Sequence, residues 1–255
     1  MKLFVRGLIG LVCLLTLWQL ASAVGLFPEN YLPPPSVVLP LLVELLAQEE
    51  FLRHVIATVL AWAIALGIAA AVAIPAGLIL GSIHAVRVAT RTVIEFLRPI
   101  PSVALIPLAI VLIGAGPETK ISLAVYAAVW PILFNTIYAL DEIDPLLLDT
   151  AKSFGTSRTQ VLLSVSLPHA APFVFTGIRM ASTVALIVVI SVEYVAGGRL
   201  GIGKFTLEAS SGSGRQDLVL AATLLAGLIG YLIDGCFVRA QRSMLRWSVT
   251  EARTS

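Results

Sequence analysis

The feature that most constrains this chain is a run of 29 residues, Val55–Ile83, without a single charged side chain. About 20 apolar residues in a helix suffice to cross the hydrocarbon core of a bilayer. A soluble protein of this size cannot hide so long a run, because part of every folded surface faces water. Composition agrees, since 58% of the residues are hydrophobic and 13% are charged, against about 25% charged in soluble domains. An ordinary soluble enzyme and a disordered chain are therefore excluded.

Five further stretches are apolar enough, or nearly so, to cross a membrane. Backbone groups in a bilayer must be satisfied within the segment, so these stretches predict helices rather than strands. The sequence thus predicts an all-α integral membrane protein with six transmembrane helices. The predicted spans are Gly7–Phe27, Val55–Ile83, Ile100–Pro117, Ile121–Leu140, Phe173–Tyr194 and Leu218–Val238.

Three of these spans have unusual features. Val55–Ile83 contains Pro75 and a Gly77-x-x-x-Gly81 step, which predict a kink or close packing near its end. Ile100–Pro117 is short and has three prolines at or near its entry; we interpret this irregular backbone as core packing near the pathway, with a solute site as the alternative. The first span begins after a basic segment and contains Ala-Ser-Ala at 21–23, as a cleavable signal peptide would. Because apolarity continues to Phe27, we interpret it as a retained span.

Orientation follows from the distribution of Lys and Arg in the short loops. With the N-terminus inside, eleven of the 17 basic residues lie in inner segments and five in outer ones, while Arg179 lies within a span. Both termini are therefore predicted to be cytoplasmic. Net charge is only +2, which gives no basic surface for nucleic acid.

The inner segment 141–172 carries helix signals of its own. Pro145 can open a helix and Gly155 can end it in a left-handed conformation. Ser157-x-x-Gln160 is a capping box that opens a second short helix, which Pro168 is expected to close. We expect a helical hairpin at the cytoplasmic face. An amphipathic hairpin resting on lipid is the alternative, but the segment is net acidic and therefore favours a protein partner.

At these residues the chain resembles the EAA loop of ABC-importer permeases, Glu-Ala-Ala-x₃-Gly-x₉-Ile-x-Leu-Pro. The spacing matches throughout, and Asp149 and Thr150 stand where the family has Glu and Ala. The resemblance implies contact with a separate ATPase through Asp149, Thr150, Ala151, Lys152, Gly155, Val165, Leu167 and Pro168.

Further segments resemble the sulfonate/taurine/nitrate branch of these permeases. They are Leu32–Ser36, Phe96–Pro107, Pro131–Thr136 and Gly177–Arg179. The resemblance implies a type I ABC-importer permease fold in the cell membrane, a homodimer, a cytoplasmic ATPase dimer and an extracytoplasmic solute-binding protein. It divides the chain into a first helix and outer segment (1–54), a five-helix permease core with the hairpin (55–238) and a cytoplasmic tail (239–255).

Five polar side chains within predicted spans are candidate pathway or intramembrane polar groups. Charges there are costly when they face lipid, by about 2.5–3.5 kcal/mol at mid-bilayer. Arg179 and Asp234 both lie near the inner ends of their spans, where they can form an ion pair or each extend to the interface from the end of its own span. Glu193 lies near the outer mouth, as a pathway group or an ordinary interfacial carboxylate. Asn135 and Thr136 are candidate pathway groups or interhelical hydrogen-bond donors.

One motif imitates a nucleotide site. Gly198–Lys204 has the form G-x-x-x-x-G-K, but Phe205 stands where a P-loop has Ser or Thr, and the predicted topology places it outside. The three histidines show no metal-ligand spacing. We therefore expect no catalytic residue, metal or cofactor, and energy from another subunit.

The predicted function is a permease subunit that moves a small solute by alternating access. The branch suggests a sulfonate, taurine or nitrate, and relatives for vitamin-like heterocycles are an alternative. An ion-coupled secondary transporter is the rival from another class, although it should show internal repeats and ionisable groups at the midplane. A membrane-embedded hydrolase or a purely structural subunit are weaker rivals.

Overall fold

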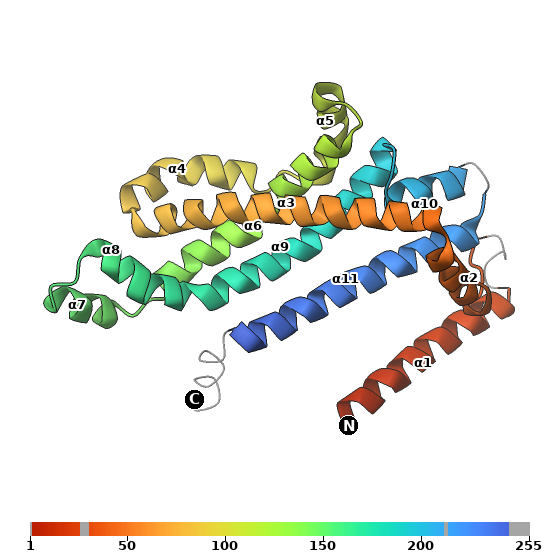
Figure 1. Cartoon of the computed structure of the whole chain (residues 1–255), viewed down its shortest axis with the longest axis horizontal. Helices are drawn as coiled ribbons and strands as arrows, with labels where there is room; N and C mark the ends of the chain where they lie inside the picture. Colours follow the sequence, from red (N-terminus) through yellow and green to blue (C-terminus); the bar gives the residue numbers. More distant parts are fainter. Residues whose placement is uncertain (1, 26–30, 212–213, 245–255) are drawn as a thin grey trace.

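In a computed structural model of the chain, the described residues are 2–25, 31–211 and 214–244, and every regular element among them is helical (Figure 1). The elements in chain order are α1 (Lys2–Ala23), α2 (Pro35–Ala47), α3 (Glu49–Ser82), α4 (His84–Leu97), η1 (Ser102–Leu105), α5 (Ile106–Ile113), α6 (Pro117–Asp141), α7 (Pro145–Ser153), α8 (Arg158–Val161), η2 (Leu162–Ser166), α9 (Leu167–Ala196), α10 (Ile202–Ser211) and α11 (Gln216–Met244). The end of the first predicted span and the tail beyond Met244 lie outside the described residues.

Five helices are long and apolar enough to cross a membrane: α1, α3, α6, α9 with its preceding turn, and α11. A sixth span exists if the bent pair of α4 and the η1–α5 segment is counted as one. These helices confirm the multi-pass all-α prediction.

The third predicted span, Ile100–Pro117, is wrong as a single helix. The chain bends by 75° between His84–Leu97 and Ser102–Ile113, and α5 alone has only eight residues. Pro99 and Pro101 lie at the bend, where proline supplies no backbone donor and cannot continue a helix. The sequence reading also missed α4, which it treated as an inner loop, and the short helices α2 and α10.

The core is built where α3, α6 and α9 pack together (Figure 1). Helix α3 has a stripe of buried alanines at four-residue spacing. Buried alanines of α6 and α9 belong to the same core cluster. Small side chains let helix backbones approach closely in a membrane, where packing rather than water exclusion holds helices together. The stripe on α3 consists of Ala61, Ala65, Ala69 and Ala73.

The Gly77-x-x-x-Gly81 step marks the closest approach of α3 to α6. A Cβ at Gly77 would lie 2.6 Å from Cβ of Thr136, and one at Gly81 would meet the side chain of Leu140. The predicted close packing is therefore present, and it holds the inner end of α3 against the last turns of α6.

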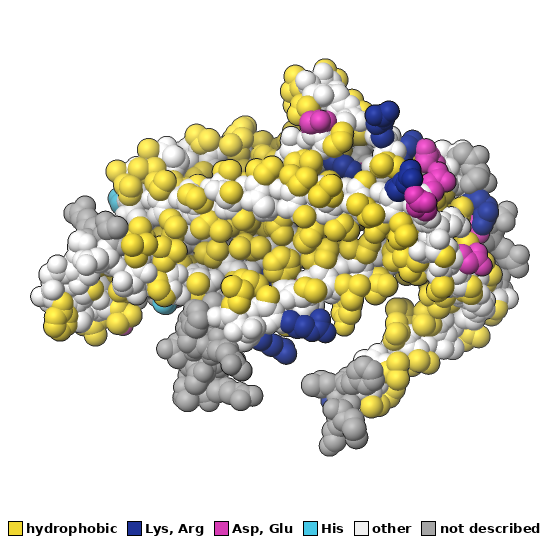
Figure 2. Space-filling view, viewed as in Figure 1, with side chains coloured by type: hydrophobic (Ala, Val, Ile, Leu, Met, Phe, Trp, Pro, Cys, Tyr) yellow, Lys and Arg dark blue, Asp and Glu magenta, His cyan; other side chains and the backbone are white. Residues whose placement is uncertain are grey.

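A second cluster packs α2, α10 and α11 against the start of α3, around Phe51 and Ile202. This cluster forms one end of the molecule and the α7–α8 segment lies at the other (Figure 1). By the predicted orientation these are the outer and the inner end. Apolar side chains cover most of the face between them, and the charges visible in Figure 2 gather around α5, at the α2–α10 end and near the end of α11. Such a surface suits contact with lipid tails.

Candidate functional site

The α7–α8 hairpin at the inner end is shaped by its own sequence. Asp144 accepts a hydrogen bond from the backbone N–H of Leu146 at 2.8 Å, which caps α7. Gly155 has φ +73°, and the N–H of Thr156 reaches back to the C=O of Ala151 at 3.2 Å. This closure is the left-handed glycine C-cap that the sequence predicts.

The start of the second helix also has its predicted capping box. The Ser157 backbone N–H donates to Oε1 of Gln160 at 3.0 Å, and the Gln160 N–H donates to Oγ of Ser157 at 3.3 Å. The two caps make the turn between α7 and α8 a defined structure rather than a loose loop.

The expectation that Pro168 closes this second helix is wrong. Helix α8 continues through the π-helical turn η2 into α9, with Pro168 in the first turn of α9. A proline lacks the N–H of the regular ladder and its ring crowds the carbonyl four residues earlier. In η2 the N–H of Leu167 bonds to the C=O of Leu162, five residues back, and this wider spacing accommodates the proline.

Most of the hairpin is uncovered. Phe154 is 85% exposed and Leu146 is 70% exposed, although both are large and apolar. Of the residues that match the EAA pattern, Asp149, Thr150, Gly155 and Pro168 are exposed, while Ala151, Val165 and Leu167 are half-buried; the side chain of Lys152 lies outside the described residues. Exposed apolar side chains on a rigid hairpin are typical of a surface that another protein covers.

The outer end holds a buried polar network instead. Lys120 on α6 donates from Nζ to Oε1 of Glu193 on α9 at 2.6 Å, and both side chains are at least nine-tenths buried. Thr58 on α3 donates to the same carboxylate at 2.8 Å, and the Gly203 N–H donates to it at 3.2 Å. Three hydrogen-bond donors from α6, α3 and α10 thus compensate one buried carboxylate, as burial of a charge requires.

The network extends into the glycine-rich segment that precedes α10. The Gly201 N–H lies 3.0 Å from Nδ1 of His54, and the Ile202 N–H donates to Oγ1 of Thr58 at 2.9 Å. A Cβ at Gly201 or Gly203 would collide with Glu193. The G-x-x-x-x-G-K segment therefore uses its glycines to pack against α9, and this structural role agrees with the rejection of a nucleotide site there.

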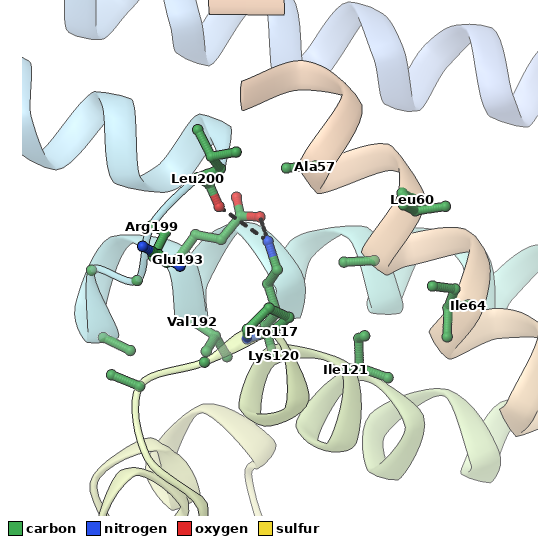
Figure 3. Close-up of a pocket in the computed structure, with 16 residues that line it drawn as sticks. Ala57, Leu60, Ile64, Pro117, Lys120, Ile121, Val192, Glu193, Arg199 and Leu200 are labelled. Atoms are coloured by element: carbon green, nitrogen blue, oxygen red, sulfur yellow. Dashed lines mark hydrogen bonds and ion pairs between the residues drawn. The ribbon is translucent and has the colours of Figure 1, made fainter. Parts of the chain in front are cut away.

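A pocket of about 310 Å³ opens beside this network (Figure 3). Lys120 and Glu193 point toward each other at its base, and Ala57, Leu60 and Ile64 of α3 form one wall. Arg199 lines the rim from the segment after α9. The pocket thus contains two cations and one carboxylate, within largely apolar walls.

The other polar residues expected within spans have different surroundings. Arg179 and Asp234 form the expected ion pair, with hydrogen bonds of 2.5 and 2.7 Å, and each side chain is 39% exposed. Asn135 and Thr136 donate to backbone carbonyls of their own helix, Pro131 and Ile132.

Sequence reasoning does not identify Lys120 and Thr58 as partners of Glu193, or His54 as a partner of the Gly201 backbone. Lys120 is one of the five basic residues that the predicted orientation places in outer segments, yet it immediately precedes a charge-free span and lies at the same depth as Glu193. The reasoning that paired Arg179 with Asp234 at the inner ends would also pair these two at the outer ends.

These features define a multi-pass membrane protein. Its outer end is held together by a buried polar network, and its inner end carries an exposed helical hairpin. The chain belongs to the family of binding-protein-dependent transport system inner membrane components, which it matches over residues 73–246. It is a permease subunit of the ABC-importer class.

Individual relatives agree with this assignment. The chain is 30% identical to the taurine transport system permease protein TauC of Escherichia coli, over 93% of this chain and 87% of that one. It is 31% identical to the putative aliphatic sulfonates transport permease protein SsuC of the same species, over 93% and 89%. A putative ABC transporter permease of Methanocaldococcus jannaschii is 34% identical over 66% of this chain, and the match spans 62% of that relative.

The fold also matches a solved structure. A chain of the MetNI methionine ABC transporter, crystallised in inward-facing conformations, superposes with a TM-score of 0.62. The match covers 75% of this chain and 94% of that one at 22% identity, and it supports the fold alone.

Proposed function

We propose that two copies of this chain form the membrane pathway of an importer whose energy comes from a separate cytoplasmic ATPase dimer. The observation that carries the proposal is the α7–α8 hairpin. Its backbone is fixed by two caps and a left-handed glycine, while Leu146 and Phe154 are left exposed. A rigid hairpin with exposed apolar side chains can sit in a groove of a partner and transmit that partner's displacement.

In this mechanism the ATPases close on ATP and draw the two hairpins together. The membrane helices of the two copies then switch from an inward-open to an outward-open arrangement. An extracytoplasmic binding protein delivers solute to the outer end. ATP and the loaded binding protein must each bind one state better than the other, because a ligand shifts an equilibrium only by its differential affinity.

The proposed solute is a small organic or inorganic anion. Relatives carry names for taurine, aliphatic sulfonates, nitrate and bicarbonate transport. The outer pocket supports the same class, since Lys120 and Arg199 outnumber Glu193 among its charged residues. Glu193 is proposed as a structural counter-ion of Lys120 that also borders the solute's entry.

The test is uptake by proteoliposomes that contain this chain with its ATPase and binding protein. Labelled taurine, nitrate and bicarbonate would be offered in parallel, with a thiazole- or pyrimidine-type heterocycle as the competing class. We expect uptake of an anion that requires ATP and survives dissipation of ion gradients. Uptake that follows an ion gradient with ATP held constant would instead favour the secondary transporter.

The coupling role of the hairpin is tested by Gly155→Glu. We expect this variant to insert normally and to lose uptake, because a bulky charged residue is strained at φ +73° and occupies the proposed contact. Gly214→Glu is the matched control, since Gly214 also has a left-handed backbone, φ +63°, and open surroundings, but lies before α11 at the outer end. Normal uptake by Gly155→Glu would refute the coupling role.

A further inference from the structure

Arg87, in the first half of α4, connects three helices through one guanidinium group. Its Nε donates to the C=O of Leu80 at 2.9 Å and its Nη2 donates to the C=O of Gly81 at 3.0 Å, both in the last turn of α3. Its Nη1 and Nη2 also donate to the two carboxylate oxygens of Asp141 at 3.1 and 2.9 Å. Asp141 is the last residue of α6, four residues before Pro145 opens the hairpin.

The chemistry of this contact is specific to arginine. The last carbonyls of a helix have no partner within the helix, so the two α3 carbonyls need an external donor. A planar guanidinium offers donors in several fixed directions and can serve these carbonyls and a bidentate carboxylate together. A lysine ammonium carries the same charge but cannot reproduce the fork.

Helix α4 packs loosely against its neighbours, so its contacts through Arg87 matter for its position. Helix α4 has no buried residue, and a cleft of about 300 Å³ lined by Ile94, Phe134 and Ile137 lies between it and α6. By contrast, α3 and α6 touch directly, because the side chain of Leu140 fills the space beside Gly81. Arg87 therefore ties a loosely packed helix to the tight α3–α6 contact at the base of the hairpin.

We infer that Arg87 is a positioning residue that makes α4 and the end of α3 move together with the base of the hairpin. The inference rests on the proposed coupling role of that hairpin. A displacement of Asp141 relative to α3 would strain all four hydrogen bonds at once, so the tie resists independent motion of the three helices. A coupling defect without loss of assembly is the expected signature of breaking it.

The experiment compares Arg87→Lys with Arg91→Lys in the complete transporter in proteoliposomes. Arg91 lies one turn further along α4 and pairs with Glu95 in an exposed ion pair within the same helix, 2.8 Å apart. The readouts are membrane insertion, ATP hydrolysis, and uptake of whichever of labelled taurine, nitrate or bicarbonate the wild type transports. We expect Arg87→Lys to assemble and hydrolyse ATP while solute moved per ATP falls about tenfold, a typical coupling factor. Arg91→Lys should match the wild type.

A second variant separates coupling from stability. Asp141→Asn leaves the two α3 carbonyls with their Arg87 donors and removes only the charge at the hairpin base, so it should show the same uncoupling. Equal transport per ATP in Arg87→Lys and Arg91→Lys would overturn the inference, as would loss of assembly in both Arg87→Lys and Asp141→Asn. If Gly155→Glu also transports normally, the hairpin proposal itself fails; if Gly155→Glu is inactive and Arg87→Lys is normal, only this inference fails.

Discussion

The outer and inner ends of this protein treat polar and apolar groups in opposite ways. At the outer end a charged pair, Lys120 and Glu193, is buried and held by three helices and a glycine-rich segment. At the inner end large apolar side chains such as Phe154 stand exposed on a hairpin fixed mainly by local caps. The polar network of the outer end is satisfied within the single chain, whereas the inner hairpin has apolar surface that the chain itself does not cover.

The largest expected effect on stability comes from removing one partner of the buried ion pair between Lys120 and Glu193. Glu193→Leu removes the counter-ion of a buried ammonium and should lower stability by about 3–5 kcal/mol, as breaking a buried pair usually does. The double variant Lys120→Met/Glu193→Leu should recover most of this loss, because apolar replacement of a whole buried pair is often neutral. Thermal unfolding in detergent measures both.

A double variant as unstable as the single one would show that the remaining hydrogen bonds, rather than charge compensation, hold the outer end. Glu193→Gln keeps the shape of the side chain and removes its charge, so it tests whether Glu193 affects the choice of transported anion. A changed preference among anions in that variant would make Glu193 a pathway group, and unchanged preference would leave it a structural one.

A smaller effect is expected where the tight bundle meets the hairpin. Gly77→Ala places a Cβ against Thr136 and should cost about 1–3 kcal/mol through overpacking. Gly67→Ala is the control on the same helix, because nothing lies within 4 Å of its added Cβ. It should be neutral or stabilising by up to about 1 kcal/mol. Equal unfolding temperatures for the two variants would mean that α3 and α6 are not in close contact near the inner end.

The pair between α9 and α11 should contribute less than the outer pair. Arg179 and Asp234 are each 39% exposed, so solvent screens the pair and Asp234→Asn should lower the unfolding temperature less than Glu193→Leu does. The same unfolding assay checks it. A loss as large as that of Glu193→Leu would contradict the contrast between a buried outer pair and a partly open inner one.

The smallest effect on stability is expected at the hairpin. Phe154→Ser removes a side chain that is 85% exposed, so the unfolding temperature of the isolated chain should stay the same within error. Co-purification with the ATPase should nevertheless weaken. Unchanged association would show that Phe154 is not part of the partner surface, and a large loss of stability would show that the chain itself covers it.

The sequence determined the class of this protein and much of its local structure. Long charge-free runs can only be stable as membrane helices, and the caps at Gly155 and Ser157 depend on neighbours a few residues away. The depth of Arg179 and Asp234 allowed their pairing, and the structure chose it over separate contacts with the interface. Each of these rests on short-range chemistry or on the fixed thickness of a bilayer.

Only the tertiary structure decided how the ends are built. The bend between α4 and α5 and the run of α8 through a π turn into α9 depend on how the chain accommodates prolines, which can end, kink or enter a helix. Lys120 is a buried counter-ion because α3, α6 and α9 meet at one depth. Arg87 contacts three helices because the end of α3, the start of α4 and the end of α6 lie together there. The residues of the outer network come from three separate stretches of the chain, 54–58, 120 and 193–203, so no local pattern could bring the three stretches together.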